Sequence, residues 1–185
     1  MTLIVRTSTD SDLTAITALY GHHVRHGTGT FELDPPTLED MMQRRAEVLG
    51  RGLPYLVASD DDALLGFAYC NWFKPRPAYR YSAENSIYVA PEAQRRGVAR
   101  ALLAELLRQA ETTGVRRMIA VIGDSANAGS IGVHRALGFQ PAGVLPNCGW
   151  KFGRWLDVVL MDRALGLGAS AAPDESSSVV SATTP

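Results

Sequence analysis

Residues 92–111 read "EAQRRGVARALLAELLRQAE", a basic, glycine-containing loop that leads directly into an amphipathic helix. Apolar side chains recur at three- and four-residue spacing from 97 to 113, which is the period of a helix with one buried face. Upstream, "AENSIYVA" (83–90) is typical of a strand that Pro91 stops, and downstream "VRRMIAVIG" (115–123) is typical of another strand. This strand–helix–strand unit predicts a pair of parallel strands, because the helix can serve as their crossover.

The remaining segments predict one mixed domain around this unit. The element order β-α-α-β-β-β-α-β-α-β-β is typical of an α/β (α+β) fold, with a mixed, mostly antiparallel sheet and helices on both faces. Residues 1–167 are expected to form the domain, and the Ala-, Ser-, Thr- and Pro-rich residues 168–185 are expected to be disordered. The other expected elements are a strand at 2–5, a helix opened by "TSTD" (7–10), an irregular segment at 21–36, a helix at 36–50 with a capping box from Thr37 to Asp40, a hairpin of strands at 53–59 and 63–73, a helix from near Asn127 that stops at Gly138, and strands at 140–145 and 153–165.

Composition excludes several classes of function. The 185 residues carry a net charge of −1, which offers no electrostatic reason to expect a nucleic acid or an anionic membrane as partner. The N-terminus does not resemble a signal peptide, and no apolar run reaches membrane-spanning length. Cys70 and Cys148 cannot form a disulfide framework, so a cytoplasmic protein with reduced thiols is expected. We expect no metal site, and interpret His22, His23 and His26 as surface residues because no suitably spaced acidic or cysteine partner accompanies them.

The loop before the long helix has two possible explanations. Backbone N–H groups at a helix N-terminus favour a bound anion, and the small residues Gly97 and Ala99 would let it approach the main chain. Arg95, Arg96 and Arg100 add positive charge, which opposes the helix dipole in a first turn unless an anion is bound. The alternative is a capped helix with a solvated basic first turn. From these residues alone, both remain open.

Four polar residues elsewhere could take part in chemistry. Glu84 lies near the start of a strand, where it is either an edge charge in solvent or a general base with a pKa raised by burial. His134 on the helix after Asn127 is either a packed or surface histidine or an acid–base residue. Asn127 and Ser130 stand at the start of that helix, where such residues commonly form caps.

The stretch "QRRGVA" (94–99) resembles the Q/R-x-x-G-x-G/A pyrophosphate signature of the GNAT superfamily of acetyl-CoA-dependent acyltransferases. The element order is also that of the GNAT fold, in which the sheet splays to form an acetyl-CoA cleft. The resemblance covers residues 2–163. Within the superfamily, four further stretches resemble the phosphinothricin and methionine sulfoximine acetyltransferase group: "GTFE" (29–32), "YSAENSIYV" (81–89), "NAGSIGVHRALGF" (127–139) and "GWKFGRWLDVVLM" (149–161).

This resemblance implies an acetyl-CoA-dependent N-acetyltransferase that transfers acetyl directly to the α-amino group of a small amino-acid-like substrate. It implies Glu84 as the base, His134 as a second acid–base residue, and a homodimer. The expected acetyl-CoA contacts are Ile87, Tyr88, Val89, Gln94, Arg95, Arg96, Gly97, Val98, Ala99, Arg100, Asn127 and Ser130. The expected acceptor contacts are Phe31, Lys74, Arg76, Tyr79 and Asn85. The cations before the strand at 83–90 would suit a carboxylate or phosphinate substrate, and the alternative is that they belong to a solvated loop. Two other functions remain open on the same fold: acetylation of a protein or peptide amine, and CoA binding without catalysis.

Overall fold

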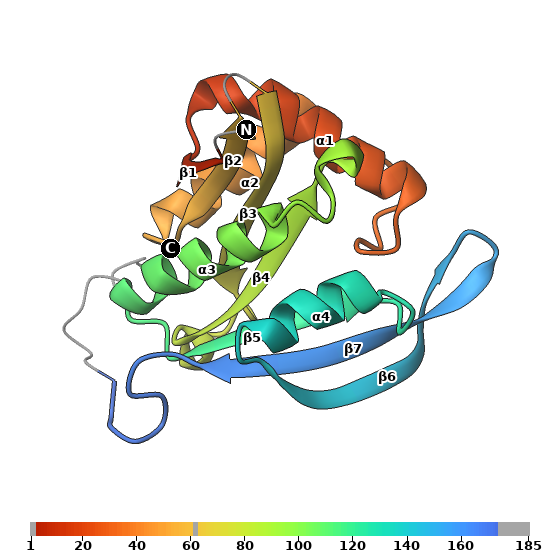
Figure 1. Cartoon of the computed structure of the whole chain (residues 1–185). Helices are drawn as coiled ribbons and strands as arrows, with labels where there is room; N and C mark the ends of the chain where they lie inside the picture. The colour runs from red at the N-terminus through yellow and green to blue at the C-terminus, as the bar shows by residue number, and fades with distance from the viewer. Residues whose placement is uncertain (1–2, 61–62, 174–185) are drawn as a thin grey trace.

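The computed structural model describes residues 3–60 and 63–173, and Figure 1 shows a twisted sheet with helices on both faces. Seven strands lie in the order β1-β2-β3-β4-β5-β7-β6. The GNAT-type element order expected from the sequence is confirmed. The helices and strands, in chain order, are β1 (Ile4–Thr7), α1 (Leu13–His26), α2 (Leu38–Gly50), β2 (Tyr55–Asp60), β3 (Ala63–Trp72), β4 (Ser82–Val89), α3 (Val98–Thr112), β5 (Arg117–Gly123), α4 (Ala128–Ala136), β6 (Gln140–Lys151) and β7 (Arg154–Ala164).

β4 and β5 form the parallel pair predicted from the sequence, and the other neighbouring strands pair antiparallel. The parallel register starts at Ser82 opposite Arg117 and stops at Asn85 opposite Ala120. Both strands run on past this point, β4 to Val89 and β5 to Gly123. The sheet therefore splays between them, as the diverging ribbons of Figure 1 show.

Two layers of helices bury the sheet. α3 and α4 cover one face, and α1 and α2 cover the other (Figure 1). The periodic apolar side chains of α3 are buried, so the amphipathic pattern correctly predicted its inner face. Burying each large aliphatic side chain contributes about 1.5–3 kcal/mol, which stabilises the helix whose N-terminus borders the splayed strands. The buried members are Val98, Leu102, Leu103, Leu106, Leu107 and Ala110.

Residues close to the helix ends set most of the helix boundaries, but tertiary packing sets the end of α1. Thr37 and Asp40 form the expected capping box at the start of α2. The irregular segment expected from residue 21 is wrong in its first part, because α1 continues to His26. Gly21 lies against Pro35, and Val24 is almost fully buried, so tertiary contacts hold this last part of α1 in place.

The C-terminal hairpin is longer than the sequence suggested. We expected a strand at 140–145, but β6 continues to Lys151, with register shifts against β7 between Pro141 and Gly143 and between Leu145 and Gly149. Such bulges break the regular alternation from which strand length is judged. The extension brings Lys151 to the region of the cavity described below.

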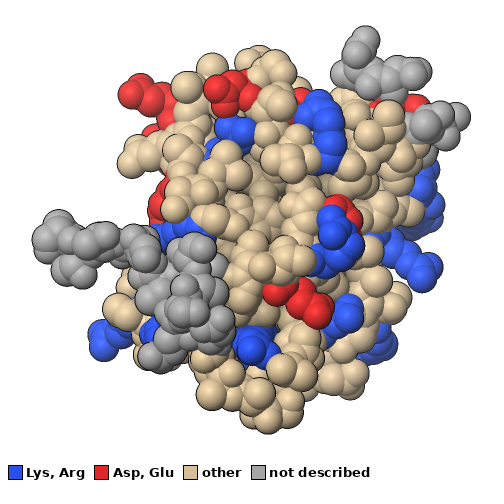
Figure 2. Space-filling view, turned by 90° about the vertical axis from the view of Figure 1, so that its left-hand side faces the viewer, with Lys and Arg blue, Asp and Glu red and all other residues tan. Residues whose placement is uncertain are grey.

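Some expectations fall outside the described residues. The hairpin turn includes residues 61–62, the first strand was expected from residue 2, and residues 174–185 belong to the expected disordered tail; none of these is described. On the face shown in Figure 2, basic and acidic side chains lie interspersed. No helix within the described ranges is both long and apolar enough to cross a bilayer.

Candidate active site

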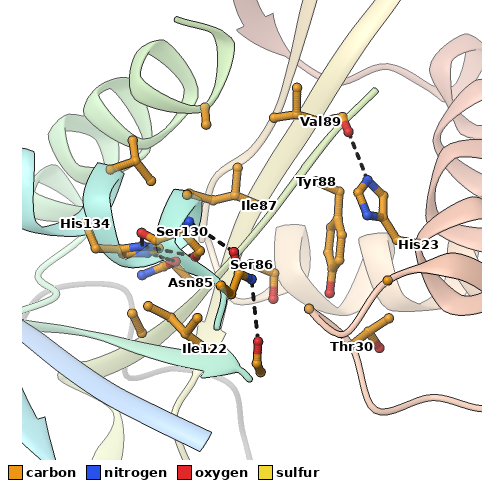
Figure 3. Close-up of a pocket in the computed structure, with 18 of the residues that line it drawn as sticks. His23, Thr30, Asn85, Ser86, Ile87, Tyr88, Val89, Ile122, Ser130 and His134 are labelled. Atoms are coloured by element: carbon orange, nitrogen blue, oxygen red, sulfur yellow. Dashed lines mark hydrogen bonds between the residues drawn. The ribbon is translucent and has the colours of Figure 1, made fainter. Parts of the chain in front are cut away.

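A cavity of about 1000 Å³ occupies the splay between β4 and β5. Its lining comes from both helical layers: the starts of α3 and α4 on one face, and α1 with the loop that follows it on the other. Figure 3 shows these two sides, with His134 and Ser130 near α4, and His23 and Thr30 near α1. The cavity therefore connects the two faces of the sheet.

Strand alternation assigns each β4 side chain to one of these faces. Asn85 contacts His134 on the α4 face. Tyr88 contacts Tyr20 of α1, with ring centroids 4.9 Å apart, on the opposite face. Glu84 lies four residues before Tyr88 on the same strand, so its side chain points to the same face, that of α1. The carboxylate and the histidine proposed for acid–base work thus lie on opposite faces of one strand.

Glu84 lines the cavity in a desolvated environment. Burial raises the pKa of its carboxyl above the ordinary value, and the positive charge of Lys74 partly opposes that rise. A carboxylate with a raised pKa is a stronger proton acceptor than an exposed glutamate. Its environment therefore suits a general base rather than a solvated edge charge.

His134 is only 3% exposed, and both ring nitrogens have partners. Nδ1 lies 2.7 Å from the Ser130 carbonyl oxygen, and Nε2 lies 3.0 Å from Asn85 Oδ1. Asn85 donates through Nδ2 to the Ile119 carbonyl, which leaves Oδ1 as an acceptor toward the histidine. Each contact calls for an N–H on its own ring nitrogen, so the two acceptors together favour the doubly protonated ring, whereas burial lowers the pKa of His134 and favours the neutral form, which can donate only one of the two bonds.

The loop before α3 has the backbone expected of an anion site. Gly97, the N-cap of α3, has φ of 84°, and Arg95 has φ of 59°, a conformation uncommon outside glycine. Left-handed residues within a turn aim successive N–H groups toward one concavity, which suits phosphate. Gln94, Arg95 and Arg100 line the cavity beside this turn. The residues fit the pyrophosphate of a coenzyme A.

The remaining expected cofactor contacts line the cavity, with the exception of Arg96. Asn127 caps α4 by accepting a hydrogen bond from the Ser130 N–H at 3.1 Å, so the predicted capping is confirmed. The other expected contacts that also line the cavity are Ile87, Tyr88, Val89, Val98, Ala99 and Ser130. The lining of this cavity leaves out Arg96.

His23 corrects the interpretation of the α1 histidines as surface residues. It is half-buried, lines the cavity and contacts Tyr88, with ring centroids 5.3 Å apart. Its Nε2 donates to the Val89 carbonyl at 3.0 Å, since a carbonyl can only accept (Figure 3). His23 reaches this position because α1 continues to His26, whereas an irregular segment was expected from residue 21. Among the described residues, no group of three His, Cys, Asp or Glu side chains could hold a metal ion.

The expected acceptor residues are brought together only in part. Phe31 and Asn85 line the cavity, although the Asn85 amide is engaged with His134 and Ile119. The other expected acceptor residues belong to the connection before β4 and lie outside the lining. This group comprises Lys74, Arg76 and Tyr79. The positive charge of Lys74 nevertheless lowers the pKa of Glu84.

Sequence reasoning missed several residues of the cavity. Tyr20 and Thr30 line it and hydrogen-bond to each other at 3.0 Å. Tyr20 falls on the apolar face of the first helix, and Thr30 stands within the stretch "GTFE" (29–32), but neither was assigned a role in the site. Gly123, at the end of β5, also lines the cavity and lies against the backbone of Thr28. These contacts join segments far apart in the chain, so only the folded structure reveals them.

Comparison with known proteins agrees with this geometry. The profile of the Acetyltransferase (GNAT) family matches residues 18–139. The chain is 51% identical over 170 residues to a phosphinothricin N-acetyltransferase of Alcaligenes faecalis, covering 92% of this chain and 86% of that protein. It is 36% identical over 172 residues to an L-methionine sulfoximine/L-methionine sulfone acetyltransferase of Pseudomonas paraeruginosa, covering 92% and 99%.

A solved structure extends the agreement to three dimensions. The crystal structure of a GNAT superfamily phosphinothricin acetyltransferase from Sinorhizobium meliloti, in complex with AcCoA, superposes with a TM-score of 0.94. The two chains are 42% identical, and the match covers 98% of each. The family profile over residues 18–139, the sequence identity over 92% of the chain and the superposition over 98% of it agree, and the chain therefore belongs to the acetyltransferase (GNAT) family.

Proposed function

We propose that this N-acetyltransferase transfers acetyl from acetyl-CoA to the α-amino group of a small amino-acid-like substrate, of the kind exemplified by phosphinothricin and methionine sulfoximine or sulfone. The names of the relatives support this acceptor class. The observation that carries the mechanism is the half-buried Glu84 on the α1 face of the cavity, opposite the anion-ready loop before α3. The cavity would admit the two substrates from opposite faces of the sheet.

Glu84 is the proposed general base. Most amines are protonated at neutral pH and cannot attack a carbonyl until a proton is removed. A carboxylate whose pKa is raised by burial accepts that proton, directly or through one water. The free amine then attacks the thioester carbonyl, and backbone N–H groups of the unpaired β4 edge at residues 86–89 would stabilise the oxyanion that forms.

His134 is assigned to the other half of the reaction. It lies on the α4 face, beside the β4 residues 87–89 that are expected to contact acetyl-CoA, so we assign it to the departing thiolate rather than to the amine. Delivery of its Nε2 proton requires the hydrogen bond to Asn85 to open. Cys70 is buried within the core and Cys148 lies outside the cavity lining, so we propose direct transfer without an acyl-enzyme.

The acceptor class is tested by presenting a panel of amines with acetyl-CoA and measuring thiol release. We expect turnover with amino acids that carry a tetrahedral phosphorus or sulfur group in the side chain, and little with peptides. Turnover confined to peptide or protein N-termini would replace this proposal with the protein-acetylating alternative. Tight CoA binding with no turnover of any amine would favour a binding module.

Lys74 is expected to tune the base from outside the cavity. Its charge lowers the pKa of Glu84, so Lys74→Met should raise that pKa further. The base is active when deprotonated, so activity is lost as pH falls through the pKa. The acid limb of the pH profile of kcat/KM should therefore move to higher pH in the variant.

The control for this prediction is Arg108→Met, which removes an exposed cation of α3 outside the cavity lining. Its profile should match the wild type. High salt should move the wild-type limb toward that of Lys74→Met, because an exposed charge is screened. An unchanged limb in Lys74→Met, with acceptor KM raised, would instead make Lys74 a substrate contact.

A homodimer and a cytoplasmic location are also part of the proposal. β6 is an edge strand on which Val144 and Leu145 are both exposed, and Trp150 and Trp155 are each 57% exposed at the end of the hairpin. Exposed apolar side chains on an edge strand favour association. Sedimentation should give twice the chain mass. Two free cysteines, Cys70 and Cys148, are typical of a reducing compartment.

A further inference from the structure

The loop 27–31 forms a wall of the cavity on the α1 face. All five of its residues line the cavity, and it joins α1 to the segment that precedes α2. In Figure 1 it descends from the end of α1 toward the C-terminal hairpin. Since Glu84 points to this same face, the loop borders the space where the amine must approach its base.

Lys151 holds this loop from the far end of the chain. Its ammonium donates to the Gly27 carbonyl at 2.9 Å and to the Thr30 carbonyl at 2.8 Å. The residue is only 4% exposed. Burying an ammonium is costly unless acceptors replace the lost water. Two carbonyls of one short loop provide that replacement here, and they fix the loop relative to β6.

Two glycines leave room for the loop against the sheet. A Cβ added at Gly149 would lie 2.3 Å from the Phe31 ring, and one added at Gly123 would lie 2.0 Å from the Thr28 carbonyl oxygen. Neither distance is sterically possible without movement. The loop therefore sits directly on the ends of β5 and β6, with Lys151 tying down its backbone.

The opposite side of the loop is held by a second network. Tyr20 accepts from the Thr30 hydroxyl and donates to Glu32 Oε1 at 2.7 Å. Arg44 of α2 pairs with the same carboxylate oxygen at 2.7 Å. The loop is thus fixed from α1 and α2 on one side and from the C-terminal hairpin on the other.

We infer that Lys151 is a positioning residue that sets the shape of the acceptor end of the cavity by fixing the loop 27–31, and so determines how well a small amine is held. This inference rests on the proposed function, because it takes the α1 face as the acceptor side. Lys151 touches neither reacting atom. Its effect should fall on the acceptor and spare the coenzyme, whose expected contacts lie at α3, α4 and β4.

Lys151→Met tests the inference, since it removes the ammonium and keeps an unbranched chain. We expect KM for the acceptor to rise about tenfold or more, and KM for acetyl-CoA to stay within about twofold. Hydrogen exchange of the amides of residues 27–31 should become faster, while exchange in β4 stays unchanged. The exchange measurement needs no turnover, so it tests the loop contact even if the proposed acceptor class is wrong.

Arg45→Met is the matched control. Arg45 is another largely buried cation that donates to a backbone carbonyl, that of Ser8 at 2.6 Å, and it lies outside the cavity lining. Its loss should lower stability without changing acceptor KM or the exchange of the loop. If both variants raise the two KM values equally, Lys151 is only a stabilising residue and the inference fails.

Gly149→Ala provides a second route if Lys151→Met folds poorly. It displaces the Phe31 ring and leaves the buried ammonium in place. The same selective rise in acceptor KM is expected. Unchanged acceptor KM in folded Lys151→Met or in Gly149→Ala, with loop exchange as in the wild type, would overturn the assignment.

Discussion

Replacing Glu84 with glutamine is expected to lower kcat by about 10²- to 10⁴-fold, the usual contribution of a general base. Glutamine keeps the size of the side chain and cannot accept the amine proton. Affinity for acetyl-CoA should remain within about twofold, because Glu84 points to the α1 face, away from the loop before α3. Stopped-flow thiol release and calorimetric titration with CoA measure the two quantities separately.

The pH profile distinguishes a base from a residue that only shapes the cavity. Wild-type activity should fall as pH drops through the raised pKa of Glu84, and Glu84→Gln should lack that limb. The difference between the two proteins should narrow at alkaline pH, where the amine is free without assistance. Glu92→Gln removes an exposed carboxylate outside the cavity lining and is the control. A variant at position 84 that turns over like the wild type would refute the mechanism.

Gly97→Val should weaken binding of acetyl-CoA by about tenfold to a hundredfold. Gly97 has φ of 84°, and a side chain in this region costs about 1–2 kcal/mol, with more for a branched residue. A valine would move the loop out of this conformation and turn its N–H groups away from the anion. Isothermal titration with CoA and with pantetheine, which lacks the phosphates, separates the contribution of the phosphates to the binding free energy from that of the pantetheine arm.

Gly52→Val is a close control for this change. Gly52 also has a positive φ, of 70°, and a Cβ at either glycine would meet nothing within 4 Å. The backbone strain should therefore be similar, but Gly52 lies outside the cavity lining. Its variant should lose stability and keep its affinity for CoA. Equal affinities in both variants would show that the loop before α3 does not bind the coenzyme.

Much of the fold could be predicted because its signals are local. The apolar period of α3, the capping box of Thr37 and Asp40, and Pro91 after β4 each act within a few residues. The parallel pair followed from connectivity, since a helix between two strands permits that pairing. The end of α1 was misjudged because Gly21 suggests a break, whereas burial of Val24 and contact with Pro35 keep the chain helical.

The candidate site could be predicted where all the residues of one binding feature lie in a single segment of the sequence. The turn before α3 carries its glycine, its arginines and its helix N-terminus within residues 94–100, and the fold places most of them around the cavity. Substrate residues were harder, because Lys74 and its neighbours looked suitable by charge alone. Their distance from the cavity depends on how the connection before β4 packs, which no local pattern records.

The sequence by itself determined the order of elements, the anion-ready start of α3 and a glutamate within a strand beside it, because these depend on neighbouring residues. Only the tertiary structure decided that Glu84 and His134 occupy opposite faces of β4, since the side to which a strand points depends on the helices that cover it. It also decided that Lys151 reaches the carbonyls of a loop more than 120 residues earlier. Such contacts require the assembled sheet, which brings the last hairpin beside the loop that follows α1.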